Sequence, residues 1–281
     1  MKQSTRKGIW NTVSIVILVL ASILVLLPFL WMLSTSLQPD LQSVYQIPPK
    51  WIPEPLTWQN FLTAWNSAPF DVYLKNSIIV ALSATLLQLL NAAMSAYAFS
   101  WLNFPGRDII FLFFLAVLMI PGQVTLVPNY IVMSRLDWIN TYWALIIPVS
   151  VTAFGTFLIR QAFLSVPKDL IDAAVIDGAT HLQILWRILV PLNKPTLLTF
   201  ALLSFNWRWN NYFWVLIMTN STDMRTLPVG LVQMRMGPEQ GSQWQIIMAG
   251  TVLVLTPIML LFAFFQRYFV EGVTRSGLKG V

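Results

Sequence analysis

Six long apolar stretches divide this chain, and five of them contain no charged residue, while the other is interrupted only by Arg208. Each holds at least the roughly 20 apolar residues that a helix needs to cross about 30 Å of hydrocarbon. The sequence therefore predicts an all-α, polytopic integral membrane protein with six transmembrane helices. The six stretches are 8–39, 76–106, 109–134, 138–159, 195–222 and 240–266.

The composition agrees with a membrane location. Of 281 residues, 57% are hydrophobic and 10% are charged, whereas a soluble domain carries about 25% charged residues. One membrane domain accounts for the whole chain, 1–281. Since the chain has no cysteine, disulfides, thiolate catalysis and cysteine metal sites are excluded.

Basic residues predict the orientation, because cytoplasmic loops are enriched in Lys and Arg. With the N-terminus in the cytoplasm, eleven basic residues lie inside and five outside. We therefore expect a multi-pass membrane protein with both termini cytoplasmic. The inner residues are Lys2, Arg6, Lys7, Arg107, Arg160, Lys168, Arg187, Lys194, Arg267, Arg275 and Lys279, and the outer ones are Lys50, Lys75, Arg135, Arg225 and Arg235.

A polar segment, about 167–195, separates two of the apolar stretches on the cytoplasmic side. Pro167 suits the first turn of a helix, and Gly178 is placed to end that helix in a left-handed conformation. Thr180 and Gln183 form the pattern of a capping box that starts a second helix, and Pro191 interrupts it. Such a hairpin can lie in a groove of another protein or flat on the lipid surface.

This segment resembles the EAA signature of permease subunits of ATP-binding-cassette importers. Asp172 replaces the usual glutamate, Ala173, Ala174 and Gly178 match the pattern, and Leu189-Val190-Pro191 closes it. The resemblance implies an EAA coupling helix pair that contacts an ATPase, with Asp172, Ala173, Ala174, Asp177, Gly178 and Pro191 as the coupling residues. It also implies two ATPase subunits carrying ATP and Mg²⁺, a second permease subunit and an extracytoplasmic solute-binding protein. The implied location is the prokaryotic plasma (inner) membrane.

Further motifs resemble the carbohydrate-type permeases, especially the MalG-like half of the maltose-type pair. This resemblance covers nearly the full chain and implies import of a sugar or oligosaccharide. The matching elements are Pro28 to Leu37, Lys75-Asn76-Ser77, Pro105-Gly106-Arg107, Trp209 to Tyr212, Thr226 to Leu231 and the tail from Gln266 to Gly280.

The fifth stretch contains Arg208 near its middle, flanked by Asn206, Trp209, Asn210 and Asn211. Intramembrane charges usually face a cavity or a partner, and amides with tryptophans supply the hydrogen bonds and flat apolar faces that a sugar needs. These residues are candidates for the substrate pathway. The alternative is that Arg208 reaches the membrane surface or pairs with a partner, while the amides join neighbouring helices.

Gln88, Asn91 and Gln123 are weaker pathway candidates, for which hydrogen bonding between helices is the favoured alternative. His181 is the only histidine, and a lone histidine supports neither a metal site nor a triad. The outer loop, about 34–71, carries Trp58, Phe61, Leu62 and Trp65 at helical spacing. That stripe is expected at the lipid interface, on the bundle or against an external partner.

Absent motifs separate the remaining function classes. No lysine follows a glycine, so a phosphate-binding loop is missing, and we expect no enzymatic activity and no cofactor or metal on this chain. An ion-coupled secondary transporter would need intramembrane carboxylates, but all eleven acidic residues lie outside the six stretches. A permease for glycerol phosphate or a related polar solute stays open, since Arg208 suits an anion, and a membrane scaffold would not need the cytoplasmic motif.

Overall fold

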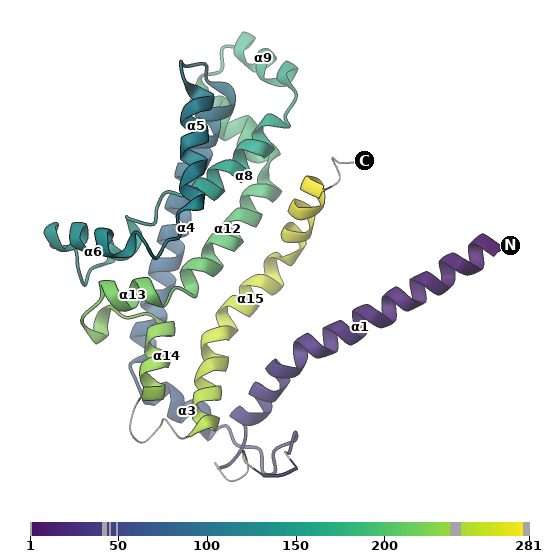
Figure 1. Cartoon of the computed structure of the whole chain (residues 1–281), viewed down its shortest axis with the longest axis vertical. Helices are drawn as coiled ribbons and strands as arrows, with labels where there is room; N and C mark the ends of the chain where they lie inside the picture. Colours follow the sequence, from purple (N-terminus) through teal and green to yellow (C-terminus); the bar gives the residue numbers. More distant parts are fainter. Residues whose placement is uncertain (1, 41–43, 45, 49, 237–242, 278–281) are drawn as a thin grey trace. The chain divides into compact units, whose positions relative to one another are not determined.

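The computed structural model describes residues 2–40, 44, 46–48, 50–236 and 243–277. Lys279, which the charge count includes, and the end of the matching C-terminal tail lie outside these residues. The chain divides into two compact units, of which the first comprises 1–69 with 231–256 and the second comprises 70–230 with 257–281. Figure 1 shows the helices of both units.

The described residues contain helices and no strand, as the composition predicts. The first unit contains α1 (Lys2–Ser36) and α3 (Gln59–Asn66). Two helices continue from one unit into the other, α14 (Leu227–Met236) and α15 (Trp244–Gly277), and the division of α15 falls at Pro257.

The second unit holds the remaining helices. They are α4 (Phe70–Trp101), α5 (Arg107–Ala116), η1 (Val117–Met119), α6 (Leu126–Arg135), α7 (Tyr142–Ile146), α8 (Ala153–Leu164), α9 (Lys168–Ile176), α10 (His181–Gln183), η2 (Ile184–Leu189), α11 (Val190–Leu192), α12 (Lys194–Trp209), α13 (Phe213–Met218) and η3 (Thr222–Met224).

Three of the six apolar stretches form long helices, and three are broken. Within the described residues, α1, α4 and α15 contain segments long and apolar enough to cross a membrane, and a fourth arises if the helices on either side of Asn193 count as one bent span. The other stretches are interrupted beside Pro121-Gly122, at Pro148 and at Asn210-Asn211. Proline removes a backbone donor, which accounts for the breaks at Pro121 and Pro148, whereas the break at Asn210-Asn211 contains no proline.

The core of the second unit lies where α8 and α12 pack against α4. Small residues of α4, namely Ala92, Ala93 and Ala96, are buried there, as is common where membrane helices approach closely. Gly155 of α8 contacts the ring of Phe200 on α12, because a β-carbon added at Gly155 would collide with that ring. Helix spacing here depends on the absence of a side chain.

The polar segment folds as the sequence predicts at its turn. Gly178 follows α9 with φ +79°, the left-handed conformation expected of a glycine C-cap. The Thr180 hydroxyl accepts from the Gln183 N–H, and the Gln183 side chain accepts from the Thr180 N–H, completing the capping box. The next turns, η2, are π-helical and lead into α11, which contains Pro191. Because proline has no N–H, it disturbs the hydrogen-bond register of an ordinary α-helix.

Candidate functional site

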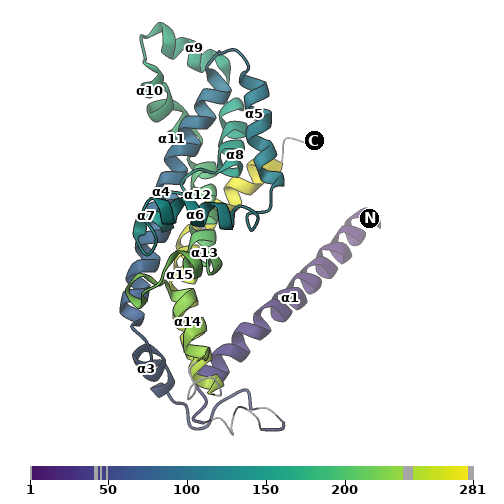
Figure 2. The same cartoon turned by 60° about the vertical axis from the view of Figure 1, so that its left-hand side comes forward.

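The helical hairpin of α9, α10 and η2 projects at one end of the second unit (Figures 1 and 2). Because it is expected to face the cytoplasm, we call it the cytoplasmic hairpin (about 167–195). Ile171 and Ala174 face inward and are buried in the cluster that contains Phe163 and Leu185. The apolar residues of α9 are therefore only partly covered, because Leu170 and Val175 remain exposed.

The exposed side of the hairpin combines acidic and apolar groups. Asp172, Ala173, Asp177 and Gly178 are all exposed. Ile176 is 85% exposed, and Leu182 beyond the turn is 65% exposed. A β-carbon added at Gly178 would meet no atom within 4 Å. This exposed surface is where the resemblance places the ATPase. Ala174, by contrast, is buried, and Pro191 is exposed in α11, beyond η2.

His181 and Tyr97 join the hairpin to α4. The Tyr97 hydroxyl lies 2.8 Å from Nδ1 of His181, and Tyr97 is buried while His181 is exposed. The single histidine is thus a hydrogen-bonded residue at the start of α10. Among the described residues, no group of three or more acidic or histidine side chains could hold a metal ion.

Arg160 of α8 ties the same end of the unit to α4 and α5. Its Nε donates to the carbonyl of Phe99 at 3.1 Å, its guanidinium lies 4.1 Å from the centre of the Phe111 ring, and a terminal nitrogen is 3.8 Å from an oxygen of Asp108. Sequence reasoning placed Arg160 only among the cytoplasmic charges and missed this bridging role. The apolar sequence on either side of it was the available signal.

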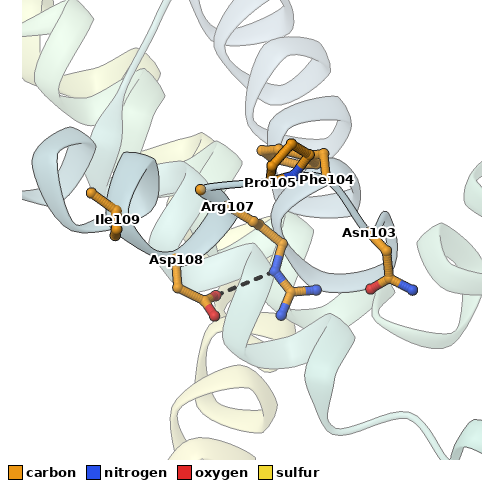
Figure 3. A pocket seen from close by; sticks show the side chains of 7 residues that line it. Asn103, Phe104, Pro105, Arg107, Asp108 and Ile109 are labelled. Atoms are coloured by element: carbon orange, nitrogen blue, oxygen red, sulfur yellow. Dashed lines mark hydrogen bonds and ion pairs between the residues drawn. The ribbon is translucent and has the colours of Figure 1, made fainter.

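A shallow pocket of about 560 Å³ lies at the adjacent turn, and Figure 3 shows its lining residues, 103–109. Arg107 Nε donates to Asp108 at 3.2 Å within this turn. Gly106 takes φ +78° at the tip. The pocket is an open surface turn whose charged groups already pair with each other.

The residues proposed for the substrate pathway do not share one environment. Trp209 is buried and stacks on Phe205, with 5.5 Å between ring centres. Asn211 accepts a hydrogen bond from the Trp214 N–H at 3.3 Å and so supports the break between α12 and α13. Nε of Arg208 is buried and has no hydrogen-bond partner among the described residues.

Asn206 and Asn210 instead lie together on the exposed side of α12. The Asn210 amide donates to the Asn206 side-chain oxygen at 2.9 Å and to its carbonyl at 3.0 Å. Asn206 also lines a groove of about 470 Å³ between α12 and the second-unit part of α15. Leu203 and Phe262 contribute apolar walls, and Gln266 contributes a second amide, which sequence reasoning did not single out.

Gln88 and Asn91 make hydrogen bonds between segments. The Gln88 amide donates to the Val149 carbonyl and accepts from the Ser204 hydroxyl, and Asn91 donates to the Ser150 carbonyl at 3.2 Å. These contacts hold the non-helical backbone before α8 against α4. Gln123 is exposed beside the break at Pro121-Gly122, and no contact between it and the other pathway candidates is found in the described part of the chain.

Comparison with known families gives a match to the model for the inner membrane component of binding-protein-dependent transport systems, over residues 88–275. The chain is 39% identical to the arabinooligosaccharides transport system permease protein AraQ of Halalkalibacterium halodurans over 229 residues, 81% of each chain. It is 33% identical to the sn-glycerol-3-phosphate permease protein UgpE of Yersinia enterocolitica over 267 residues, 93% of this chain and 95% of that one.

The fold is also similar to a chain in the crystal structure of a bacterial ABC transporter that imports the acidic polysaccharide alginate. The TM-score is 0.83 at 24% identity, and the match covers 93% of this chain and 96% of that chain. At this identity the likeness shows the fold.

Proposed function

This chain belongs to the family of binding-protein-dependent transport system inner membrane components, and on that basis we propose that it translocates a sugar or oligosaccharide that a solute-binding protein delivers. As an ABC importer permease it is a transport subunit and not an enzyme. The observation that carries the sugar assignment is the groove beside Asn206, where amides adjoin apolar walls.

The groove has the chemistry that a neutral sugar requires. The side chains of Asn206 and Gln266 can donate to and accept from hydroxyls, while Leu203 and Phe262 can cover the apolar faces of a sugar ring. Arg208, which would suit an anion, is not among the residues that line the groove. The 39% identity to an arabinooligosaccharide permease supports the same substrate class.

A glycerol phosphate or related polar anion is the second candidate. It is supported by the buried Nε of Arg208, which finds no hydrogen-bond partner in the part of the chain that the structure describes. It is also supported by the 33% identity to the sn-glycerol-3-phosphate transport system permease protein. In that case Arg208 would have to turn toward the pathway, since guanidinium groups bind phosphate through a planar fork of donors. An ion-coupled secondary transporter has no support from these relatives.

The cytoplasmic hairpin is the proposed contact for the ATPase. Asp172, Ala173, Asp177 and Gly178 offer an exposed surface beside the exposed apolar residue Ile176, and Ala174 fixes the hairpin from inside. Two ATPase subunits with ATP and Mg²⁺ would close against this surface in a complex with a second permease subunit. Closure would then be transmitted through Arg160 and Tyr97 to α5 and α4.

The proposed topology has six membrane crossings with both termini in the cytoplasm. Eleven basic residues against five support this orientation. The three broken stretches would then cross as discontinuous segments, which membranes tolerate where the non-helical backbone is buried in protein or lines a cavity.

Uptake by the complete transporter tests the substrate assignment. The full complex with its binding protein is placed in proteoliposomes containing ATP, and uptake of radiolabelled arabinooligosaccharide and of glycerol 3-phosphate is compared. We expect ATP-dependent uptake of the oligosaccharide. Uptake of glycerol 3-phosphate alone would replace the sugar assignment by the anion assignment, and uptake driven by a proton gradient without ATP would contradict both.

A further inference from the structure

Helix α3 of the first unit reverses the usual pattern in part, since it buries a polar residue while large apolar side chains are exposed. Asn60 is 6% exposed and Ala64 is fully buried. Trp58 and Leu62, near the opposite side of the helix, are 67% and 58% exposed. A helix on a water-exposed surface turns its apolar side inward, so this arrangement needs an apolar neighbour outside the helix.

The buried polar group fixes α3 to the end of α1. The Asn60 amide donates to the carbonyl of Ser36 at 2.9 Å and to the carbonyl of Gln38 at 2.7 Å. Both carbonyls lie at the C-terminal end of α1, where intrahelical partners run out. Asn60 therefore caps the long helix from outside and holds α3 at one level.

The length of α1 allows that level to be the boundary between membrane and water. The apolar part of α1 spans Trp10–Ser36, 27 residues, which is about 40 Å at 1.5 Å per residue. This exceeds the roughly 30 Å of hydrocarbon, so a membrane-spanning α1 has the length to place Ser36 among the lipid headgroups. The segment before α3 is anchored at the same level through Trp51. The Ser34 hydroxyl donates to the Trp51 carbonyl, and the centres of the Trp31 and Trp51 rings lie 5.0 Å apart.

We propose that the exposed side of α3, formed by Trp58 and Leu62 with Leu56 beside them, lies in the headgroup region of the bilayer as a lipid-binding foot. Tryptophan is enriched at this depth because its ring is apolar with one polar edge. Residues 59–66 carry no charge, so burial against lipid leaves no charge unpaired. By the proposed orientation this is the outer leaflet.

Spin labelling tests the lipid foot in the full complex in lipid nanodiscs. The chain has no cysteine, so Leu62→Cys, made with cysteine-free partner subunits, gives one labelling site. Dissolved oxygen concentrates in the bilayer, and a charged nickel chelate stays in water. We expect a nitroxide at position 62, and one at Trp58→Cys, to collide several-fold more often with oxygen than with the nickel chelate.

Glu54→Cys is the matched control, since Glu54 is exposed in the same loop and charged, and it should show the reverse preference. Leu62 and Glu54 are both exposed, so neither substitution disturbs the Asn60 hydrogen bonds. Assembly of each variant is checked by gel filtration. Three results would overturn the proposal: nickel access equal to oxygen access at position 62, exclusion of both reagents in the complex alone, or exclusion that appears only when the binding protein is added. The last would make the surface a docking site for that protein.

Discussion

The cytoplasmic hairpin and the amide-rich end of α12 both contain clustered polar residues, but the structure uses them differently. In the hairpin, Asp172 and Asp177 are exposed, and no hydrogen bond or ion pair to their carboxylates is found among the described residues. In α12, Trp209 is buried and Asn211 supports a helix break, so only part of the cluster faces outward. Polar residues without internal contacts are the better candidates for partners or substrates.

The largest effect is expected at Gly178, where the proposed difference between the cytoplasmic hairpin and the end of α12 can be tested directly. Gly178→Trp should abolish coupled transport while the permease still assembles, because a side chain there meets nothing inside this chain but enters the proposed ATPase surface. ATP hydrolysis and uptake are measured on purified complex with and without binding protein.

Gly178→Asn is the control for backbone strain. A residue with a β-carbon loses about 1–2 kcal/mol in the left-handed region, and Asn tolerates it best. We expect Asn to retain most activity. Normal uptake in the Trp variant would show that the hairpin is not an ATPase contact at this position.

Gln88→Leu should chiefly affect stability. It leaves the Val149 carbonyl without the Gln88 amide, and an unpaired buried group costs about 1–3 kcal/mol. It also removes one partner of the Ser204 hydroxyl, which keeps its contact with the Thr85 hydroxyl. Thermal unfolding of the detergent-purified complex should begin at lower temperature. An unchanged melting temperature with altered substrate affinity would move Gln88 into the pathway.

Asn206→Ala should weaken uptake of a neutral sugar by about 1 kcal/mol, the usual net value of one hydrogen bond. Uptake rate against substrate concentration, at matched amounts of assembled complex, measures this. Trp209→Phe is the control, because Trp209 is buried and stacked on Phe205 and should change stability more than affinity. If Asn206→Ala, Asn210→Ala and Arg208→Lys all leave the kinetics unchanged, the sugar site lies on the partner permease.

Asp172→Glu should have the smallest effect. Asp172 is exposed on α9, and glutamate keeps its charge while restoring the residue usual in the EAA signature. We expect ATPase activity and uptake equal to those of the unchanged complex. A clear loss would show that the shorter carboxylate is fitted to its own ATPase.

The turn of the hairpin was predictable because its signals are local. Gly178, Thr180 and Gln183 act through backbone positions no more than three residues away. The breaks within the apolar stretches were not predicted, although Pro121, Pro148 and Asn210 lay in view. The absence of charge indicates that a segment lies in an apolar environment. It does not indicate whether the backbone of that segment stays helical.

The partners of buried polar groups were the least predictable part. Gln88 meets Ser204 across 116 residues of sequence, and Asn76 donates to the carbonyls of Asp223 and Arg225. Nothing near Gln88 or Asn76 in the sequence specifies those partners. The reversal of α3 was hidden for the same reason, since it depends on Asn60 finding the free carbonyls of another helix.

Because of the contact between Gly155 and Phe200, substitutions at these two positions constrain each other in evolution. Because a methyl group at 155 would occupy the space of the Phe200 ring, neither site can drift independently while α8 and α12 keep their distance. Related permeases that carry alanine or serine at the first position should carry a smaller side chain at the second. Pairs that obey this exchange would preserve helix spacing across the family, and a lineage with alanine and phenylalanine together would have moved the two helices apart.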